Sequence, residues 1–88
     1  MLFVTLIKLR KKLSKADLER VKAGLKGSEK FGAKTVGMYF TLGRYDIVLV
    51  SECPDEKAHM KVSMQFGDLA HSESMVAIPA EEAEKLVE

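Results

Sequence analysis

The sequence predicts an α+β fold in which the elements follow the order β-α-β-β-α-β, with a short helix after them. Three observations carry this prediction. Two short runs, residues 2–7 and 47–50, are the most continuously apolar of the chain and are rich in β-branched side chains, as buried strands are. Two longer stretches repeat apolar residues at helical spacing, and one glycine-containing connection joins two strand-like segments. At 88 residues, the chain has the length of one domain, which we expect to span residues 1–88.

Local signals define the first strand and the first helix. Residues 2–7 form the expected strand, which ends at a basic cluster. Ser14 is suited to cap free backbone N–H groups at a helix start, and Asp17 then lies near the positive end of the helix dipole. Apolar residues share one face of this helix as far as Leu25. We expect the helix to reach about residue 31, because Gly32 suits the left-handed conformation that ends many helices.

A hairpin occupies the middle of the chain. Residues 34–42 and 46–52 have the composition of strands, and only Gly43-Arg44-Tyr45 separates them. A connection this short joins antiparallel neighbours, so we predict that these two strands pair with each other.

A second helix and a fourth strand complete the pattern. Asp55 is a suitable N-cap, and apolar residues recur at helical spacing from there toward residue 67. Residues 73–78 form the last expected strand, and Pro79 opens a short terminal helix.

This order, with right-handed crossovers and a central hairpin, predicts a ferredoxin-like sandwich with a four-stranded antiparallel sheet. The first and third strands lie in its centre, which agrees with their continuous apolar runs. An antiparallel sheet with helices on one face normally alternates apolar and polar residues, and these central strands do not. We therefore expect both faces to be covered, the second by the sheet of another copy. The predicted partner is the protein itself, as a homodimer or a higher even oligomer.

Composition and charge exclude several function classes. Hydrophobic residues make up 47% and charged residues 31% of the chain, which is typical of a folded soluble protein. The net charge is +1, so we interpret the basic cluster at residues 8–15 as a solvated loop and predict no nucleic-acid partner. No apolar stretch resembles a secretory signal or a membrane span. With the lone Cys53, these features predict a cytoplasmic protein without a membrane partner.

The hairpin turn offers one candidate recognition site. Arg44, Tyr45 and Asp46 bring a cation, a phenol and a carboxylate to the mouth of the hairpin, and we name them as candidate ligand-binding residues. Turn geometry is the competing explanation, and we favour it. Gly43 supplies a positive φ, Asp46 accepts backbone N–H bonds and Tyr45 packs at the end of the sheet. Only Arg44 lacks such a structural role.

His59, His71 and Cys53 form no recognisable catalytic or metal-binding pattern. His59 lies in the second expected helix without ligand spacing around it, and His71 lies in the turn before the last strand. The sequence places no base beside Cys53 that would lower the pKa of its thiol. We therefore predict no metal, no cofactor and no catalytic residue.

Residues 38–48, Met-Tyr-Phe-Thr-Leu-Gly-Arg-Tyr-Asp-Ile-Val, followed by Glu52-Cys53-Pro54-Asp55, closely resemble the GYD domain family. The glycine, tyrosine and aspartate of that name correspond to Gly43, Tyr45 and Asp46. The resemblance covers nearly the whole chain, and its specific part is the central third. It implies a dimeric α/β-barrel, in agreement with the argument from the covered sheet. It implies no chemistry, because it carries over no catalytic residue.

The resemblance also points to a second candidate site. In dimeric α/β-barrels, ligands often lie between the sheet and the helices, where Thr5 and Tyr39 are candidates to supply a hydroxyl to an apolar pocket. The competing explanation, which we favour, is a tyrosine that keeps its hydroxyl in water at the rim of the sheet.

The leading hypothesis is a small homo-oligomeric protein that binds a small molecule between sheet and helices, or that serves as an assembly module. The alternative is a cofactor-independent enzyme, of oxygenase or isomerase type, that acts on a small aromatic or keto substrate; it rests on fold analogy alone. A closed pocket that holds Tyr39 or His59 against a second titratable group would favour the enzyme. A third hypothesis is an effector-sensing partner of a DNA-binding protein, which predicts association rather than turnover.

Overall fold

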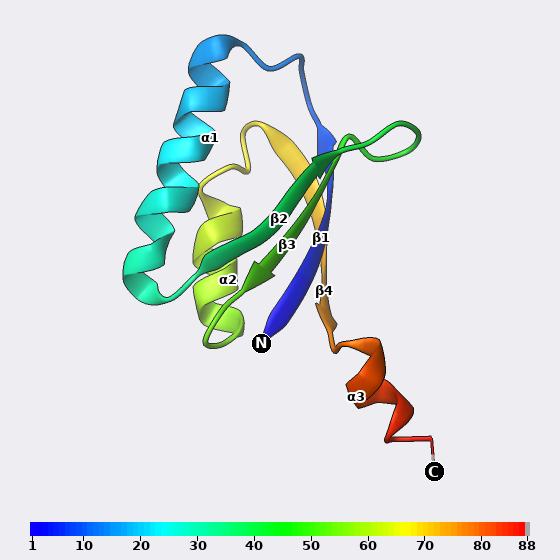
Figure 1. Ribbon diagram of the computed structural model, residues 1–88. Coiled ribbons are helices and arrows are strands. Elements are labelled where there is room, and N and C mark those ends of the chain that lie inside the picture. Colours follow the sequence, from blue (N-terminus) through cyan, green and yellow to red (C-terminus); the bar gives the residue numbers. More distant parts are fainter. Residues whose placement is uncertain (88) are drawn as a thin grey trace.

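The computed structural model describes residues 1–87; Glu88, the last residue of the expected domain, lies outside that range. Its elements follow the predicted order: β1 (Leu2–Leu9), α1 (Lys15–Gly27), the 3₁₀ turn η1 (Ser28–Phe31), β2 (Lys34–Phe40), β3 (Ile47–Glu52), α2 (Glu56–Met64), β4 (Ala70–Ala77) and α3 (Ala80–Glu84). The four strands form one antiparallel sheet in the order β2-β3-β1-β4 (Figure 1). The ferredoxin-like α+β arrangement, with β1 and β3 in the centre, is confirmed.

Both helix starts form as the sequence predicts. At α1, the Ser14 hydroxyl accepts a hydrogen bond from the backbone N–H of Asp17, and the Asp17 carboxylate accepts one from the backbone N–H of Ser14. At α2, the Asp55 carboxylate accepts a bond of 2.8 Å from the backbone N–H of Ala58. The reciprocal pair at α1 and the single bond at α2 satisfy donors that the first helical turn leaves free.

Several element ends differ from the prediction. The first helix ends at Gly27 and continues as η1 to Phe31, and Gly32 then adopts the expected left-handed conformation, with φ of 87°. The second strand ends at Phe40, two residues early. The last strand begins at Ala70 rather than at residue 73, because it pairs with β1 along its whole length. Its polar first residues carry no strand signal of their own.

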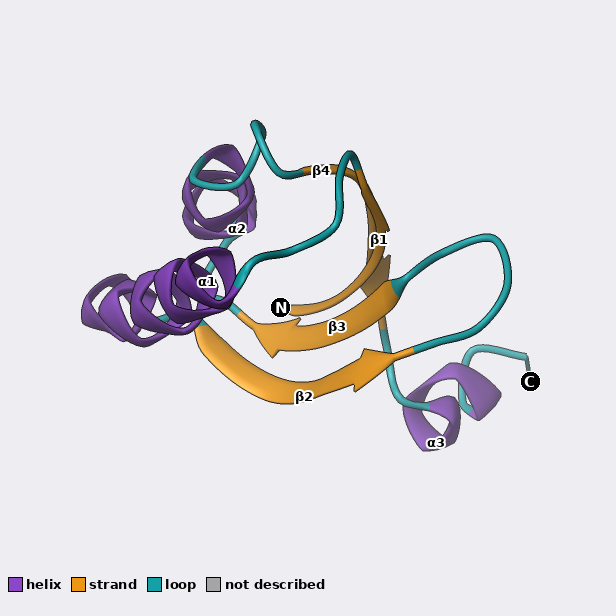
Figure 2. Cartoon of the chain, turned by 90° about the horizontal axis from the view of Figure 1, so that it is seen from above, coloured by secondary structure: helices purple, strands orange, loops and turns teal. Residues whose placement is uncertain are grey.

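The two faces of the sheet differ in their cover. Helices α1 and α2 lie together on one face, and α3 extends from the end of β4 away from both of them (Figures 1 and 2). On β1, Phe3 and Thr5 face the helices and are buried, whereas the alternating Val4 and Leu6 face the other way and are only half-buried. The sheet face away from α1 and α2, which we call the open face, is therefore apolar at its centre, with Glu73 beside Leu6 on the edge strand β4.

The buried core gathers at the end of the sheet that α2 covers. Its members come from β1, α2 and the segments that flank β2 and α2, with three half-buried side chains packed against them: Phe3, Ala33, Cys53, Ala58 and Val62, with Leu25, Phe31 and Phe66. The remaining space between the sheet and α1 is where the candidate site lies.

Candidate functional site

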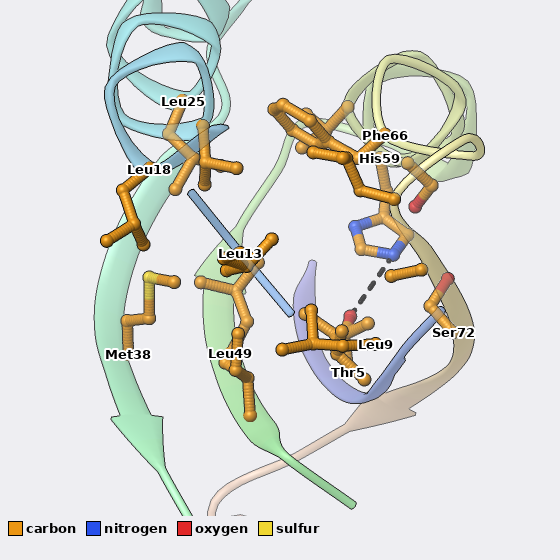
Figure 3. A pocket seen from close by; sticks show the side chains of 17 residues that line it. Thr5, Leu9, Leu13, Leu18, Leu25, Met38, Leu49, His59, Phe66 and Ser72 are labelled. Atoms are coloured by element: carbon orange, nitrogen blue, oxygen red, sulfur yellow. Dashed lines mark hydrogen bonds between the residues drawn. The ribbon is translucent and has the colours of Figure 1, made fainter. Parts of the chain in front are cut away.

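A cavity of about 80 Å³ lies between the sheet and the two helices (Figure 3). Strand residues such as Met38 and Leu49 form its floor, and Leu18 and Leu25 of α1 face it from the opposite side. Leu13, in the segment before α1, also borders it. Most of the lining is aliphatic, so the cavity is suited to a hydrocarbon.

The cavity exists because the two helices pack differently on the sheet. Helix α2 buries Ala58, His59 and Val62. No residue of α1 is buried, although its apolar residues Leu18 and Val21 line the cavity. His59 and Val62 of α2 line it too, so the two helices differ in how far their side chains are buried and not in which of them borders the cavity.

Two polar side chains that line the cavity, Thr5 of β1 and His59 of α2, meet the exposed Ser74 of β4, which lies outside the lining. We call these three side chains the hydroxyl–imidazole cluster. The Nε2 atom of His59 lies 2.6 Å from the Ser74 Oγ atom and 3.4 Å from the Thr5 Oγ1 atom. The two hydroxyl oxygens are 3.0 Å apart. The imidazole also stacks on the Phe3 ring, with centroids 4.1 Å apart and planes 5° from parallel.

The second ring nitrogen of His59 is the distinctive feature of the site. His59 is 6% exposed, and its Nδ1 atom has no hydrogen-bond partner within residues 1–87. Figure 3 shows this nitrogen on the cavity side of the ring, while Nε2 points toward Thr5. Burial lowers the pKa of His59 below its ordinary value of 6.5, so the imidazole is neutral at neutral pH.

The sequence shows no partner for His59 and does not name it as a binding residue. Its partners Thr5 and Ser74 lie 54 and 15 residues away, and only the pairing of β1 with β4, which sets Thr5 opposite Ser74, brings them together. The available signal was Thr5, a hydroxyl within an otherwise apolar strand. Such a group calls for a partner when it is buried.

The residues described at the cavity offer one titratable group rather than an acid–base pair. Of the side chains that line it within residues 1–87, His59 is the only one that titrates; the others are apolar or carry a hydroxyl. Groups of three or more His, Cys, Asp or Glu side chains that could hold a metal ion are absent from the described residues.

Thr5 and Tyr39 separate in the structure. Thr5 is buried and lines the cavity. Tyr39 follows the cavity-lining Met38 on β2, so its side chain points to the open face, where it is 59% exposed. The structure therefore places Thr5, and not Tyr39, at the cavity.

The hairpin turn lies outside the cavity lining, and its contacts are structural. Gly43 has φ of 107°. The Asp46 carboxylate accepts a bond of 2.8 Å from the backbone N–H of Leu9, and the Tyr45 hydroxyl donates one of 2.8 Å to Glu73, which raises the pKa of Tyr45. Arg44 is exposed.

The other groups considered from the sequence also lie outside the cavity lining. Arg10 donates to the Nε2 atom of His71 over 2.8 Å. Cys53 is buried, and this burial raises the pKa of its thiol. None of the helices within residues 1–87 has the length and apolar character needed to cross a membrane.

Comparison with known proteins agrees with the resemblance carried by the central hairpin. No curated protein matches the chain. The family model of the GYD domain matches residues 4–87, nearly the whole sequence. The chain therefore belongs to the GYD domain family.

Proposed function

We propose that this protein binds a small, largely apolar molecule in the cavity between the sheet and α1. The observation that supports the proposal is the Nδ1 atom of His59, a buried polar atom on the cavity side of the ring that lacks a hydrogen-bond partner within residues 1–87. Buried polar atoms are nearly always paired, and ligand sites combine an apolar lining with a few such groups.

Binding is favoured over catalysis by the composition of the lining. General acid–base chemistry of the cofactor-independent type needs a second titratable group near the first, and His59 is alone among the cavity-lining residues described. The enzyme hypothesis therefore has no specific observation in its favour.

The test fills the cavity without touching the cluster. Val21→Phe places a ring in the cavity from α1, and Lys22→Phe places the same ring on the exposed side of the same helix. We expect some compounds from a panel of small apolar molecules to shift cavity amide resonances of the natural protein and of Lys22→Phe. Val21→Phe should lose these shifts. A panel without any binder, or binding that survives Val21→Phe, would contradict the proposal.

We also propose that two copies associate through their open faces, as a homodimer or a unit of a higher even oligomer. Half-buried Val4, Leu6, Val48 and Val50, together with the 46% exposed Met75, support this, because contiguous exposed apolar patches commonly mark interfaces. A chain of this size also gains much from association.

Sedimentation at micromolar concentration tests the assembly. We expect twice the monomer mass, or a higher even multiple, for the natural protein. Leu6→Lys, at the centre of the open face, should give the monomer mass, whereas Lys12→Leu on an exposed loop should not. A monomeric natural protein would overturn the proposal.

For location, the lone and buried Cys53 supports the proposal of a reducing, cytoplasmic compartment.

A further inference from the structure

The chemistry of the ligand follows from how His59 is held. Its ring lies flat against Phe3, and its Nε2 atom is 2.6 Å from the Ser74 hydroxyl. These two contacts fix both the plane and the rotation of the imidazole. The Nδ1 atom thereby lies on the cavity side of the ring, with less than 1 Å² of its surface accessible and its one hydrogen bond unmade within residues 1–87 (Figure 3).

Either neutral tautomer of His59 is compatible with the hydroxyl–imidazole cluster. If Nε2 carries the proton, it donates to Ser74 and leaves Nδ1 as an acceptor. If Ser74 donates to Nε2, the proton is on Nδ1, which then acts as a donor. The hydroxyls of Ser74 and Thr5 rotate to suit both cases. A ligand hydroxyl both donates and accepts, so it satisfies Nδ1 in either tautomer, whereas a carbonyl satisfies only one.

The charge of the lining restricts the ligand further. No lysine, arginine, aspartate or glutamate borders the cavity within residues 1–87. A carboxylate or an ammonium group that entered would lose its hydration without gaining a counter-charge. An ionised ligand is therefore disfavoured, and the aliphatic lining suits a hydrocarbon body. An apolar cavity of about 150 Å³ accommodates benzene, so a short-chain alcohol fits this cavity of about 80 Å³, whereas a phenol enters with its hydroxyl end and leaves part of its ring at the open side.

We propose that the cavity selects small neutral alcohols and phenols through one hydrogen bond between the ligand hydroxyl and the Nδ1 atom of His59. This inference rests on the proposed binding function and specifies its ligand class. It assigns His59 as the residue that sets specificity, with Thr5, Ser74 and Phe3 as positioning residues.

Titrations followed by NMR at pH 7.5 test the inference with matched probes. Phenol, fluorobenzene and benzoate share a ring and differ in the group offered to Nδ1, and 1-butanol provides a smaller alcohol. We expect phenol to bind about tenfold more tightly than fluorobenzene, the upper range for one hydrogen bond. Benzoate should bind more weakly than phenol. In His59→Phe, which keeps a ring against Phe3, the preference for phenol over fluorobenzene should disappear.

A measurement on the natural protein serves if His59→Phe does not fold. The ¹⁵N resonance of His59 Nδ1 should move when phenol or 1-butanol is added and stay in place with fluorobenzene. Equal binding of phenol and fluorobenzene, or tighter binding of benzoate, would overturn the selection of hydroxyl compounds while leaving the binding function intact. Failure of every probe to bind would count against the binding function itself.

Discussion

Helices α1 and α2 cover the same face of the sheet, and they are held there in different ways. Helix α2 buries three side chains against the strands, whereas α1 buries none. Hydrogen bonds at two points hold α1 in place: on its exposed side Arg20 donates to both carboxylate oxygens of Asp68 over 2.8 Å each, and at its end Gln65 donates to the buried C-cap residue Ser28 over 2.9 Å. One helix thus anchors the fold, and the other leaves room for a ligand.

A matched pair of valines measures this difference most strongly. Both valines border the cavity, but Val62 of α2 is 6% exposed, whereas Val21 of α1 is only half-buried. We expect Val62→Ala to lower the free energy of unfolding by about 2 kcal/mol, since it removes two buried methyl groups and leaves a void. Val21→Ala should lower it by less than about 1 kcal/mol, because only part of its side chain leaves water on folding.

Urea unfolding of both variants provides the check. Equal losses of stability would mean that α1 packs as tightly as α2 does, and the cavity would then lose its explanation.

Two glycines of α1 differ in how closely other side chains approach them. A Cβ atom on Gly24 would lie 2.7 Å from the Phe66 ring and 2.8 Å from the Gln65 side chain, whereas one on Gly27 would meet nothing within 4 Å. We expect Gly27→Ala to raise the free energy of unfolding by up to about 1 kcal/mol through helix propensity. In Gly24→Ala the same gain is offset by overpacking, which typically costs about 1–3 kcal/mol. Thermal unfolding that ranks Gly24→Ala at or above Gly27→Ala would refute the close contact.

The prediction for pH concerns His59. Its pKa is lowered in the folded protein by burial, so below pH 6.5 the unfolded chain takes up a proton that the folded chain does not. Stability should therefore fall as the pH drops through 6.5 and continue to fall until the pH reaches the folded pKa. His59→Phe should lack this component, which a comparison of unfolding midpoints between pH 7.5 and 5 would reveal. Parallel curves for the two proteins would be inconsistent with a buried neutral imidazole.

The smallest expected effect concerns the edge contact of α1. The Arg20 guanidinium lowers the pKa of Asp68 to about 2, from an ordinary value of 3.8. The stabilisation of the folded state by the ionised Asp68 carboxylate is present above pH 3.8 and is lost as the pH falls toward 2. Because the pair is exposed, Asp68→Asn should change stability only slightly. Its effect should appear as faster amide exchange in α1 with α2 unchanged, and equal acceleration in both helices would argue against an independent role for this contact.

The fold was predictable where the signal is local. The capping residues Ser14 and Asp55 and the left-handed glycines at 32 and 43 depend only on neighbouring backbone, so the sequence identifies them directly. The start of β4 was not predictable, because its polar residues become a strand only by pairing with β1.

The site was predictable only in part, for the same reason. Thr5 is a candidate binding residue from the sequence, because it carries a hydroxyl in an otherwise apolar strand, and it lines the cavity in the structure. The role of His59 depends on distances to β1 and β4 that no local pattern encodes. The residues on both sides of Tyr39 are apolar, so the sequence does not show which face of the sheet its side chain occupies. The pairing of β2 with β3 decides this.

The most direct test of a ligand between α1 and the sheet is the position of bound phenol, from nuclear Overhauser effects between its ring protons and the methyl groups of the protein. The predicted contacts are to Leu18 and Val21 of α1 and to Met38 on the floor of the cavity. Contacts to Val4 and Val50 on the open face, without any to those three residues, would contradict a binding site beneath α1.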